Sequence, residues 1–195
     1  CVCVNRFIVQ EGVYDAFIAK LAEKVAELKV GNGMDEGVTQ GPMINQGAID
    51  KVNAHIKDAL SKGGELICGG DSHALGGTFF TPTIIGNATT HMKVATEETF
   101  GPLAPIFKFK DEEHAIALAN DTEFGLAAYF YTRDIGRVWR VGEALEYGIV
   151  GINEGIISTE VAPFGGIKQS GIGREGSHYG IEDFLEIKYM LMGGL

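Results

Sequence analysis

Strand-like and helix-like stretches alternate along most of this sequence. A short strand is expected over residues 6–9. Helices separating strands are typical of a parallel or mixed sheet, because a parallel pair needs a crossover connection. We therefore predict an α/β fold with a mostly parallel sheet flanked by helices. The first helix is indicated by apolar residues at three- and four-residue spacing, which are Val13, Phe17, Leu21, Val25 and Leu28.

Later elements follow the same rule. A second helix has an apolar stripe from Ile49 to Leu60 and ends near Gly63. Asp111 is expected to cap a helix that runs to Asn120, because its carboxylate can accept the free N–H groups of the first turn. The other expected elements are a short buried strand at 65–68, extended structure at 79–85, strands at 103–109, 127–131 and 149–152, a helix at 133–145 and an extended tail at 184–192.

Composition limits the classes of function. The chain of 195 residues fits one domain, and its net charge of −10 argues against binding to nucleic acid or an anionic membrane, which both need a basic face. No apolar run approaches the roughly 20 residues that span a bilayer, and no signal peptide is recognisable. Three cysteines make no even disulfide framework, so reduced thiols in the cytoplasm, or in the mitochondrial matrix of a eukaryote, are expected.

Residues 153–183 form a glycine- and serine-rich stretch with little periodicity, and long loops of this kind are often functional. Within it, residues 171–176 match G-x-G-x-x-G. A dinucleotide-binding loop of that pattern should follow a strand and open a helix, whereas this one lies between loops. We therefore interpret it as a loop whose glycines need positive φ angles.

The cysteines and histidines do not indicate a metal site, because the five histidines are scattered and no second ligand pair accompanies Cys1 and Cys3. Taken alone, Cys3 and Cys68 would be small buried residues. Taken alone, Glu97 and Glu98 would be part of a solvated acidic loop.

Three segments together give a sharper indication. The chain begins C-V-C, residues 97–102 read E-E-T-F-G-P, and residues 163–175 read P-F-G-G-I-K-Q-S-G-I-G-R-E. In this order and spacing they resemble the aldehyde dehydrogenase superfamily over essentially the whole chain. The C-V-C start, residues 120–131 and residues 180–189 resemble its succinate-semialdehyde branch. Enzymes that act on glutarate semialdehyde share parts of this pattern.

The resemblance implies a role for each of several residues. Cys1 would be the catalytic thiol, which forms a thiohemiacetal and then a thioester. Glu98 would bind the ribose of NAD or NADP, and Phe100 would contact the cofactor near its nicotinamide ring. Phe164 would line the aldehyde tunnel, and Ser158 would help to bind the distal carboxylate of the substrate.

The resemblance also implies a redox switch and an assembly. Cys3 would form a disulfide with Cys1 that turns activity off. Residues 1–183 would belong to the catalytic domain, and residues 184–195 would form a strand that joins the sheet of a homo-oligomer, a dimer or tetramer. The general base and most of the cofactor site would lie upstream, so that the chain alone is expected to be inactive and to self-associate through its tail.

Two other classes of function stay open at this point. A hydrolase with an N-terminal cysteine nucleophile would explain the first residue but neither of the other two motifs. A non-enzymatic binding or oligomerisation module would explain a chain that cannot turn over. A first residue other than Met is expected for a truncated or processed polypeptide.

Overall fold

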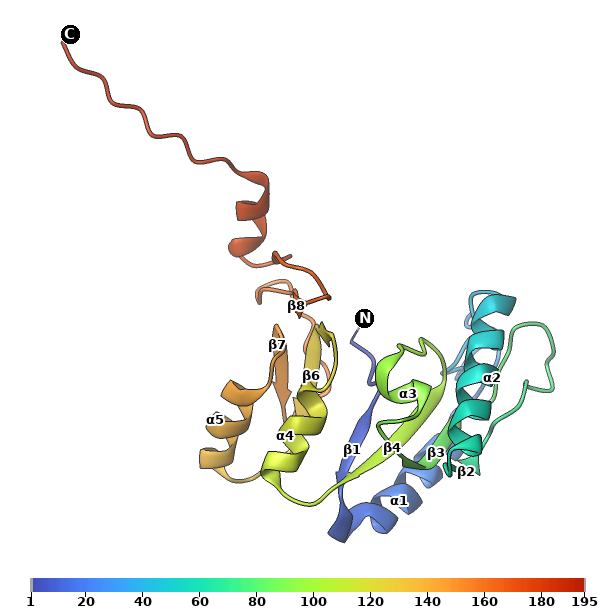
Figure 1. Ribbon diagram of the computed structural model, residues 1–195. Coiled ribbons are helices and arrows are strands. Elements are labelled where there is room, and N and C mark those ends of the chain that lie inside the picture. Colours follow the sequence, from blue (N-terminus) through green and yellow to red (C-terminus); the bar gives the residue numbers. More distant parts are fainter. Residues whose placement is uncertain (1, 195) are drawn as a thin grey trace. The chain divides into compact units, whose positions relative to one another are not determined.

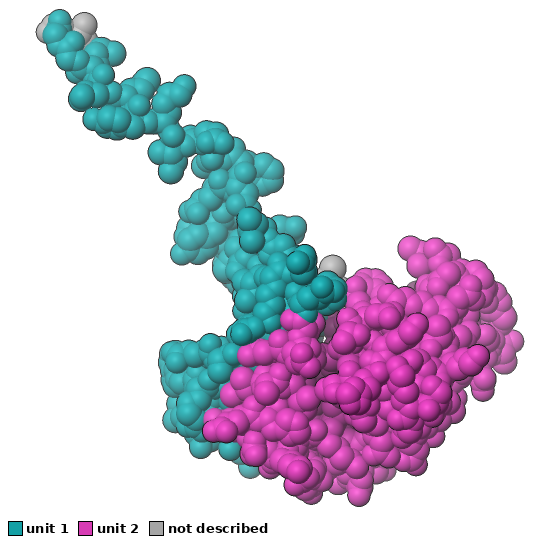
Figure 2. Space-filling view, viewed as in Figure 1, with its two compact units in different colours: residues 1–2, 123–195 teal, residues 3–122 magenta. Residues whose placement is uncertain are grey.

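A computed structural model describes residues 2–194 (Figure 1). The chain divides into two compact units, coloured separately in Figure 2. Unit 2 comprises residues 3–122, and unit 1 comprises Val2 with the chain from Glu123 onward. Each unit is described by itself.

Unit 2 contains a four-stranded sheet in the order β1-β4-β3-β2. Both β1 and β3 run parallel to β4, whereas β2 runs antiparallel to β3 along the edge. The prediction of a mixed, mostly parallel α/β sheet is confirmed. The strands are β1 (Phe7–Gln10), β2 (Glu65–Cys68), β3 (Thr83–Ala88) and β4 (Leu103–Phe109).

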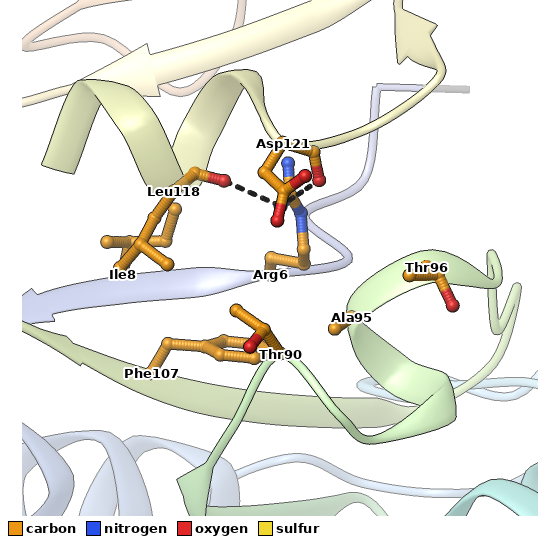
Figure 3. A pocket seen from close by; sticks show the side chains of 8 residues that line it. All are labelled: Arg6, Ile8, Thr90, Ala95, Thr96, Phe107, Leu118 and Asp121. Carbon is orange, nitrogen blue, oxygen red and sulfur yellow. Dashed lines mark hydrogen bonds between the residues drawn. The ribbon is translucent and has the colours of Figure 1, made fainter. Parts of the chain in front are cut away.

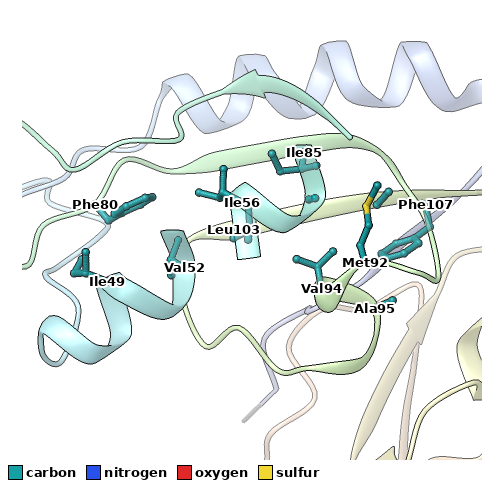
Figure 4. Close-up of a cluster of buried hydrophobic side chains, with 12 residues drawn as sticks. Ile49, Val52, Ile56, Phe80, Ile85, Met92, Val94, Ala95, Leu103 and Phe107 are labelled. Atoms are coloured by element: carbon teal, nitrogen blue, oxygen red, sulfur yellow. The ribbon is translucent and has the colours of Figure 1, made fainter. Parts of the chain in front are cut away.

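Helices cover both faces of this sheet. Neighbouring residues on a strand point to opposite faces, so Ile84 packs with α1 while Ile85 packs with α2. Figure 4 shows the α2 side, where buried residues of α2 and α3 meet β3 and β4. The helices of unit 2 are α1 (Tyr14–Ala26), preceded by the 3-10 turn η1 (Glu11–Val13), α2 (Gln46–Ser61), α3 (Lys93–Thr96) and α4 (Glu112–Asn120).

Two expectations about burial in unit 2 are wrong. Val13, Phe17, Leu28 and Leu60, all members of the expected apolar stripes, are exposed. Val13 belongs to the 3-10 turn and Leu28 follows the end of α1, so neither continues the helical stripe. Ile18 and Ala22 pack against the sheet with Leu21 and Val25. The strand at 65–68 forms, but Glu65 and Leu66 are exposed, because β2 is an edge strand.

Unit 1 contains two short strand pairs. The parallel pair joins β6 (Ala127–Phe130) to β7 (Ile149–Ile152) through α5 (Ile135–Ala144). The antiparallel pair joins β5 (Phe124–Gly125) to β8 (Ile167–Lys168). Gly148, just before β7, packs so closely on the carbonyl oxygen of Gly165 that a Cβ atom there would overlap it.

The chain after β8 contains the 3-10 turn η2 (Tyr179–Phe184) and then a segment without helix or strand (Figure 1). Apolar side chains along this tail, residues 185–194, are exposed. The oligomerisation strand expected there stays a prediction. Among the described residues, no helix is long and apolar enough to cross a membrane.

Candidate active site

The segment from Glu97 to Pro102 connects α3 to β4. Glu97 ends α3 in an extended conformation and its N–H donates to the carbonyl oxygen of Lys93 at 2.8 Å. Thr99 is buried, whereas its neighbours Glu98 and Phe100 are exposed, Phe100 by 66%. Phe100 has a φ of 51°, an uncommon value for a bulky residue that marks a constrained position. The two residues predicted to contact the cofactor therefore face solvent while the residue between them anchors the segment.

Two side chains far away in the sequence hold this segment. His55 on α2 lies 3.0 Å from the Thr99 hydroxyl through Nδ1 and 3.1 Å from the Glu97 carboxylate through Nε2. The side-chain oxygen of Asn5 accepts from the Thr99 N–H at 3.3 Å. Sequence reasoning missed both residues, because partners separated by 42 to 94 positions leave no local pattern.

The charge of Glu97 is stabilised at this site. The hydrogen bond from His55 holds the pKa of the Glu97 carboxyl below its usual value, and the nearby Lys93 and Lys51 act in the same direction. Glu97 is therefore ionised near neutral pH, and its carboxylate is available to accept the hydrogen bond from His55.

The glycine-rich segment of unit 1 is held by its own backbone. Phe164 and Glu175 exchange two hydrogen bonds, with N···O distances of 2.8 and 2.7 Å. The Arg174 guanidinium donates to the carbonyl oxygens of Gly166 and Gly173, and the Asp183 carboxylate accepts from the Arg174 N–H. Phe164 is half-buried and lines an open cleft of about 680 Å³.

The backbone conformation explains why the three glycines of the G-x-G-x-x-G match are glycines. Gly171, Gly173 and Gly176 have φ angles of 96°, 93° and 66°. These are values that L side chains rarely adopt, so the prediction of a loop that requires positive φ angles is confirmed.

Ser158 lies exposed in the loop after β7. The preceding turn is fixed by Glu154, whose carboxylate accepts from the N–H groups of Gly155 and Ile156 at 2.8 and 2.9 Å. These two bonds lower the pKa of Glu154. The predicted substrate residues Ser158 and Phe164 both belong to unit 1, whereas Glu98 and Phe100 lie together in unit 2.

Two of the three cysteines, Cys1 and Cys3, fall at the start of the chain. Cys1, the predicted nucleophile, lies outside the described residues. The Tyr129 hydroxyl donates to the carbonyl oxygen of the following residue, Val2, at 2.8 Å. Cys3 is exposed and Cys68 half-buried, so the expectation that Cys3 alone would be a small buried residue is wrong. Cys3 precedes β1 and is therefore not covered by the helices that flank the sheet.

A small cavity in unit 2 is lined by Arg6, whose guanidinium has a structural role (Figure 3). The Arg6 guanidinium donates to the carbonyl oxygens of Leu118 at 2.8 Å and Ala119 at 2.7 Å, at the end of α4. A cation at this end satisfies carbonyl groups that lack helical partners. Among the described residues, no group of three potential ligands is arranged to hold a metal ion.

Comparison with known proteins decides the family. The model of the aldehyde dehydrogenase family matches residues 1–190. This chain belongs to the aldehyde dehydrogenase family.

Individual relatives agree with that assignment. The chain is 66% identical to a succinate-semialdehyde dehydrogenase [NADP(+)] of Escherichia coli, covering 99% of this chain and 40% of the relative. It is 63% identical to a glutarate-semialdehyde dehydrogenase of Pseudomonas aeruginosa, covering 100% of this chain and 40% of the relative. A crystal structure of succinate-semialdehyde dehydrogenase from Burkholderia pseudomallei superposes with a TM-score of 0.96 at 65% identity, covering 97% of this chain and 39% of that one. This aldehyde dehydrogenase chain thus spans about 40% of the length of these relatives.

Proposed function

We propose that this chain is the nucleophile-bearing part of an aldehyde dehydrogenase that oxidises succinate semialdehyde to succinate, within a polypeptide of the length of its relatives. The family membership and the names of the relatives support this proposal. Glutarate semialdehyde is the alternative substrate, because a relative at 63% identity is named for it. A hydrolase with an N-terminal cysteine explains neither the family match nor the segment at 97–102.

The observation that carries the proposal is the arrangement of residues 97–100. The carboxylate of Glu98 and the aromatic ring of Phe100 are both exposed, on a segment whose intervening residue, Thr99, is only 4% exposed. The carboxylate of Glu98 can accept hydrogen bonds from two ribose hydroxyls, and the Phe100 ring offers an apolar surface to the nicotinamide. These two residues fit a nicotinamide dinucleotide, which would supply a hydride acceptor.

The proposed chemistry begins at Cys1. Its thiolate adds to the aldehyde carbon and forms a C–S bond, while the carbonyl oxygen becomes an oxyanion that the backbone N–H of Cys1 helps to stabilise. The aldehyde hydrogen would leave as hydride to the nicotinamide of a bound NAD(P)⁺, which restores the C=O bond and leaves a thioester. Water then attacks the thioester carbon, the C–S bond breaks, and the acid leaves with the thiolate restored.

Substrate selection is assigned to two residues of unit 1. Phe164 lines the path of the aldehyde, and the Ser158 hydroxyl donates a hydrogen bond to the distal carboxylate of the semialdehyde. Replacing Ser158 by alanine should raise the KM for succinate semialdehyde about 10- to 100-fold, the effect of one hydrogen bond to a charged group. Butyraldehyde, an uncharged aldehyde of the same length, is the matched control. An equal rise in KM for both aldehydes would contradict this role.

Activity itself is tested by NAD(P)⁺ reduction. The complete polypeptide should reduce NAD⁺ or NADP⁺ with succinate semialdehyde, and the KM values for succinate and glutarate semialdehyde should show which substrate it prefers. The 195-residue chain alone should be inactive, because it contains less than half the length of its relatives. Turnover by the chain alone, or a complete polypeptide without activity on either semialdehyde, would contradict the proposal.

Cys3 is proposed as the redox partner of Cys1. Cys3 is exposed and lies two residues after Cys1 in the sequence, and a disulfide between the two would consume the nucleophile. Peroxide should inactivate the complete enzyme and a thiol should restore it, while the Cys3→Ser variant should not be rescued in this way. Full activity of the unsubstituted enzyme after peroxide would count against the switch.

The assembly and compartment are proposed from the same resemblance. The active protein is a homo-oligomer in which the tail pairs with a strand of a second copy. The compartment is the cytoplasm, or the mitochondrial matrix in a eukaryote.

A further inference from the structure

His55 is a buried titratable side chain that the proposed chemistry does not use. It lies on α2 with a side chain that is only 1% exposed. Both ring nitrogens have partners, and both partners belong to the segment that carries Glu98 and Phe100. Burying an imidazole among apolar residues is costly unless both nitrogens are satisfied, so this arrangement specifies one position of the segment against α2.

The direction of one hydrogen bond follows from the chemistry of the partners. A carboxylate can only accept, so Nε2 of His55 bears the hydrogen and donates to Glu97 at 3.1 Å. In the neutral ring, Nδ1 is then an acceptor for the hydroxyl of Thr99, at 3.0 Å. The ring therefore bridges two residues that lie on either side of Glu98.

A further hydrogen bond with α2 holds the start of α3, the helix that precedes the segment. Asp58, one turn after His55 on α2, accepts from the Lys93 N–H at 2.8 Å. Lys93 begins α3, so α2 holds α3 at its start through Asp58 and the following segment through His55. With Glu97 and Thr99 fixed on the α2 side, Glu98 and Phe100 remain on the exposed side.

We propose that His55 is a positioning residue for the cofactor site, which acts through Glu97 and Thr99 to fix the direction of Glu98 and Phe100. This inference rests on the proposed function, because it assigns those two residues to the nicotinamide dinucleotide. His55 touches neither cofactor nor substrate. Its role is to keep the segment in one conformation before the cofactor binds, which lowers the ordering cost of binding.

Three substitutions of His55 distinguish the hydrogen bond made by Nδ1 from the one made by Nε2. His55→Leu removes both hydrogen bonds and keeps an apolar side chain in the core. His55→Asn places its amide near the position of Nδ1 and can keep the contact with Thr99, whereas His55→Gln reaches the position of Nε2 and can keep the contact with Glu97. The matched control is Ile56→Ala on the same helix, which removes buried apolar volume and no hydrogen bond to the segment.

The first readout is amide hydrogen exchange in the 195-residue chain. His55→Leu should make residues 97–101 exchange about tenfold faster, because their local opening no longer breaks two hydrogen bonds. Exchange in β6 and β7 of unit 1 should not change. The control Ile56→Ala should lower thermal stability without a selective effect on residues 97–101.

The second readout is the kinetics of the complete enzyme. His55→Leu should raise the KM for NAD(P)⁺ about tenfold and leave the KM for the semialdehyde within about twofold, with partial recovery in His55→Asn or His55→Gln. Unchanged exchange at residues 97–101, or faster exchange with an unchanged KM for NAD(P)⁺, would overturn the inference. Lack of NAD(P)⁺ reduction by the unsubstituted complete enzyme would instead contradict the proposed function, and the positioning role with it.

Discussion

At the scale of single residues, Tyr14 shows how a buried polar group joins elements in unit 2. Its hydroxyl donates to the carbonyl oxygen of Ile106 on β4 at 3.0 Å and accepts from the N–H of Asn87 on β3 at 2.6 Å. The Lys108 ammonium lies 4.2 Å from the centre of the ring. One hydroxyl at the start of α1 thus pairs backbone groups of two adjacent strands, and burial raises its pKa.

Replacing Tyr14 by phenylalanine should lower the free energy of unfolding by about 1–3 kcal/mol, because a buried carbonyl group and a partly buried N–H group lose their partner. The measurement is urea denaturation at neutral pH. Tyr131→Phe is the matched control, since Tyr131 is 71% exposed and its loss of a hydroxyl should cost less than about 0.5 kcal/mol. Equal stability of the Tyr14→Phe variant and the unsubstituted chain would contradict this account.

The same residue predicts a pH dependence. The folded-state pKa of Tyr14 is raised, whereas tyrosine in the unfolded chain ionises near pH 10. Its contribution to stability is therefore complete below about pH 10 and is lost as the pH rises through the folded-state value. The difference in stability between the unsubstituted chain and Tyr14→Phe should shrink above about pH 10 in denaturation measured at several pH values. A constant difference would contradict the raised pKa.

The residues of the candidate site differ in how visible they are in sequence. Glu98, Phe100 and Phe164 belong to contiguous motifs and could be proposed directly. His55 and Asn5 contact the same segment but come from distant positions, so only the packing of α2 and the start of β1 reveals them. Their contacts are tertiary, and a single sequence contains no periodicity that would pair them.

At the scale of elements, local chemistry predicted most helices and strands. The strand at 103–109 and the helix capped by Asp111 have the expected bounds, and the Asp111 carboxylate accepts from the His114 N–H at 2.9 Å. Exposure was harder to predict, as β2 shows, because it depends on which strand lies at the edge of the sheet. That order is set by long-range pairing and not by the residues of the strand itself.

Gly148 provides a prediction about the junction of β7 with the glycine-rich segment. An alanine there should destabilise unit 1 by about 1–3 kcal/mol, because its Cβ atom would meet the Gly165 carbonyl group and force the backbones apart. Gly142→Ala within α5 is the matched control. Its Cβ would meet open space, so it should stabilise by about 0.5–1 kcal/mol.

Thermal or chemical denaturation of the two glycine variants checks this prediction. In the Gly148→Ala variant, amide hydrogen exchange should become faster in β7 and in the segment at 164–166, where stability is lost. A Gly148→Ala variant as stable as the unsubstituted chain would show that the two backbones need not lie so close.

At the scale of the whole molecule, exposed apolar side chains gather in the tail. Ile187 is fully exposed and Leu191 is 83% exposed, on a segment that pairs with no strand among the described residues of unit 1. Unpaired extended backbone with apolar side chains tends to pair with another chain. The sequence indicated this tail as extended, but a single chain contains no information on the strand that would pair with it.

The 195-residue chain should therefore associate as its concentration rises, as measured by size-exclusion chromatography with light scattering. Ile187→Lys with Leu191→Lys should reduce association without lowering the unfolding temperature, because neither side chain is packed. Met34→Lys, at a 91% exposed site in unit 2, should leave association unchanged. A clean monomer at high concentration would contradict the role of the tail.

The central claim, that Cys1 is the nucleophile of an aldehyde dehydrogenase, is tested most directly by acid quenching the complete enzyme during turnover. Peptide mass mapping should find one succinyl group on the peptide that contains Cys1 when succinate semialdehyde and NAD(P)⁺ are both present. The adduct should be absent without cofactor and absent in Cys1→Ala. Continued turnover by Cys1→Ala, or an acyl group on Cys3 or Cys68 in its place, would contradict the claim.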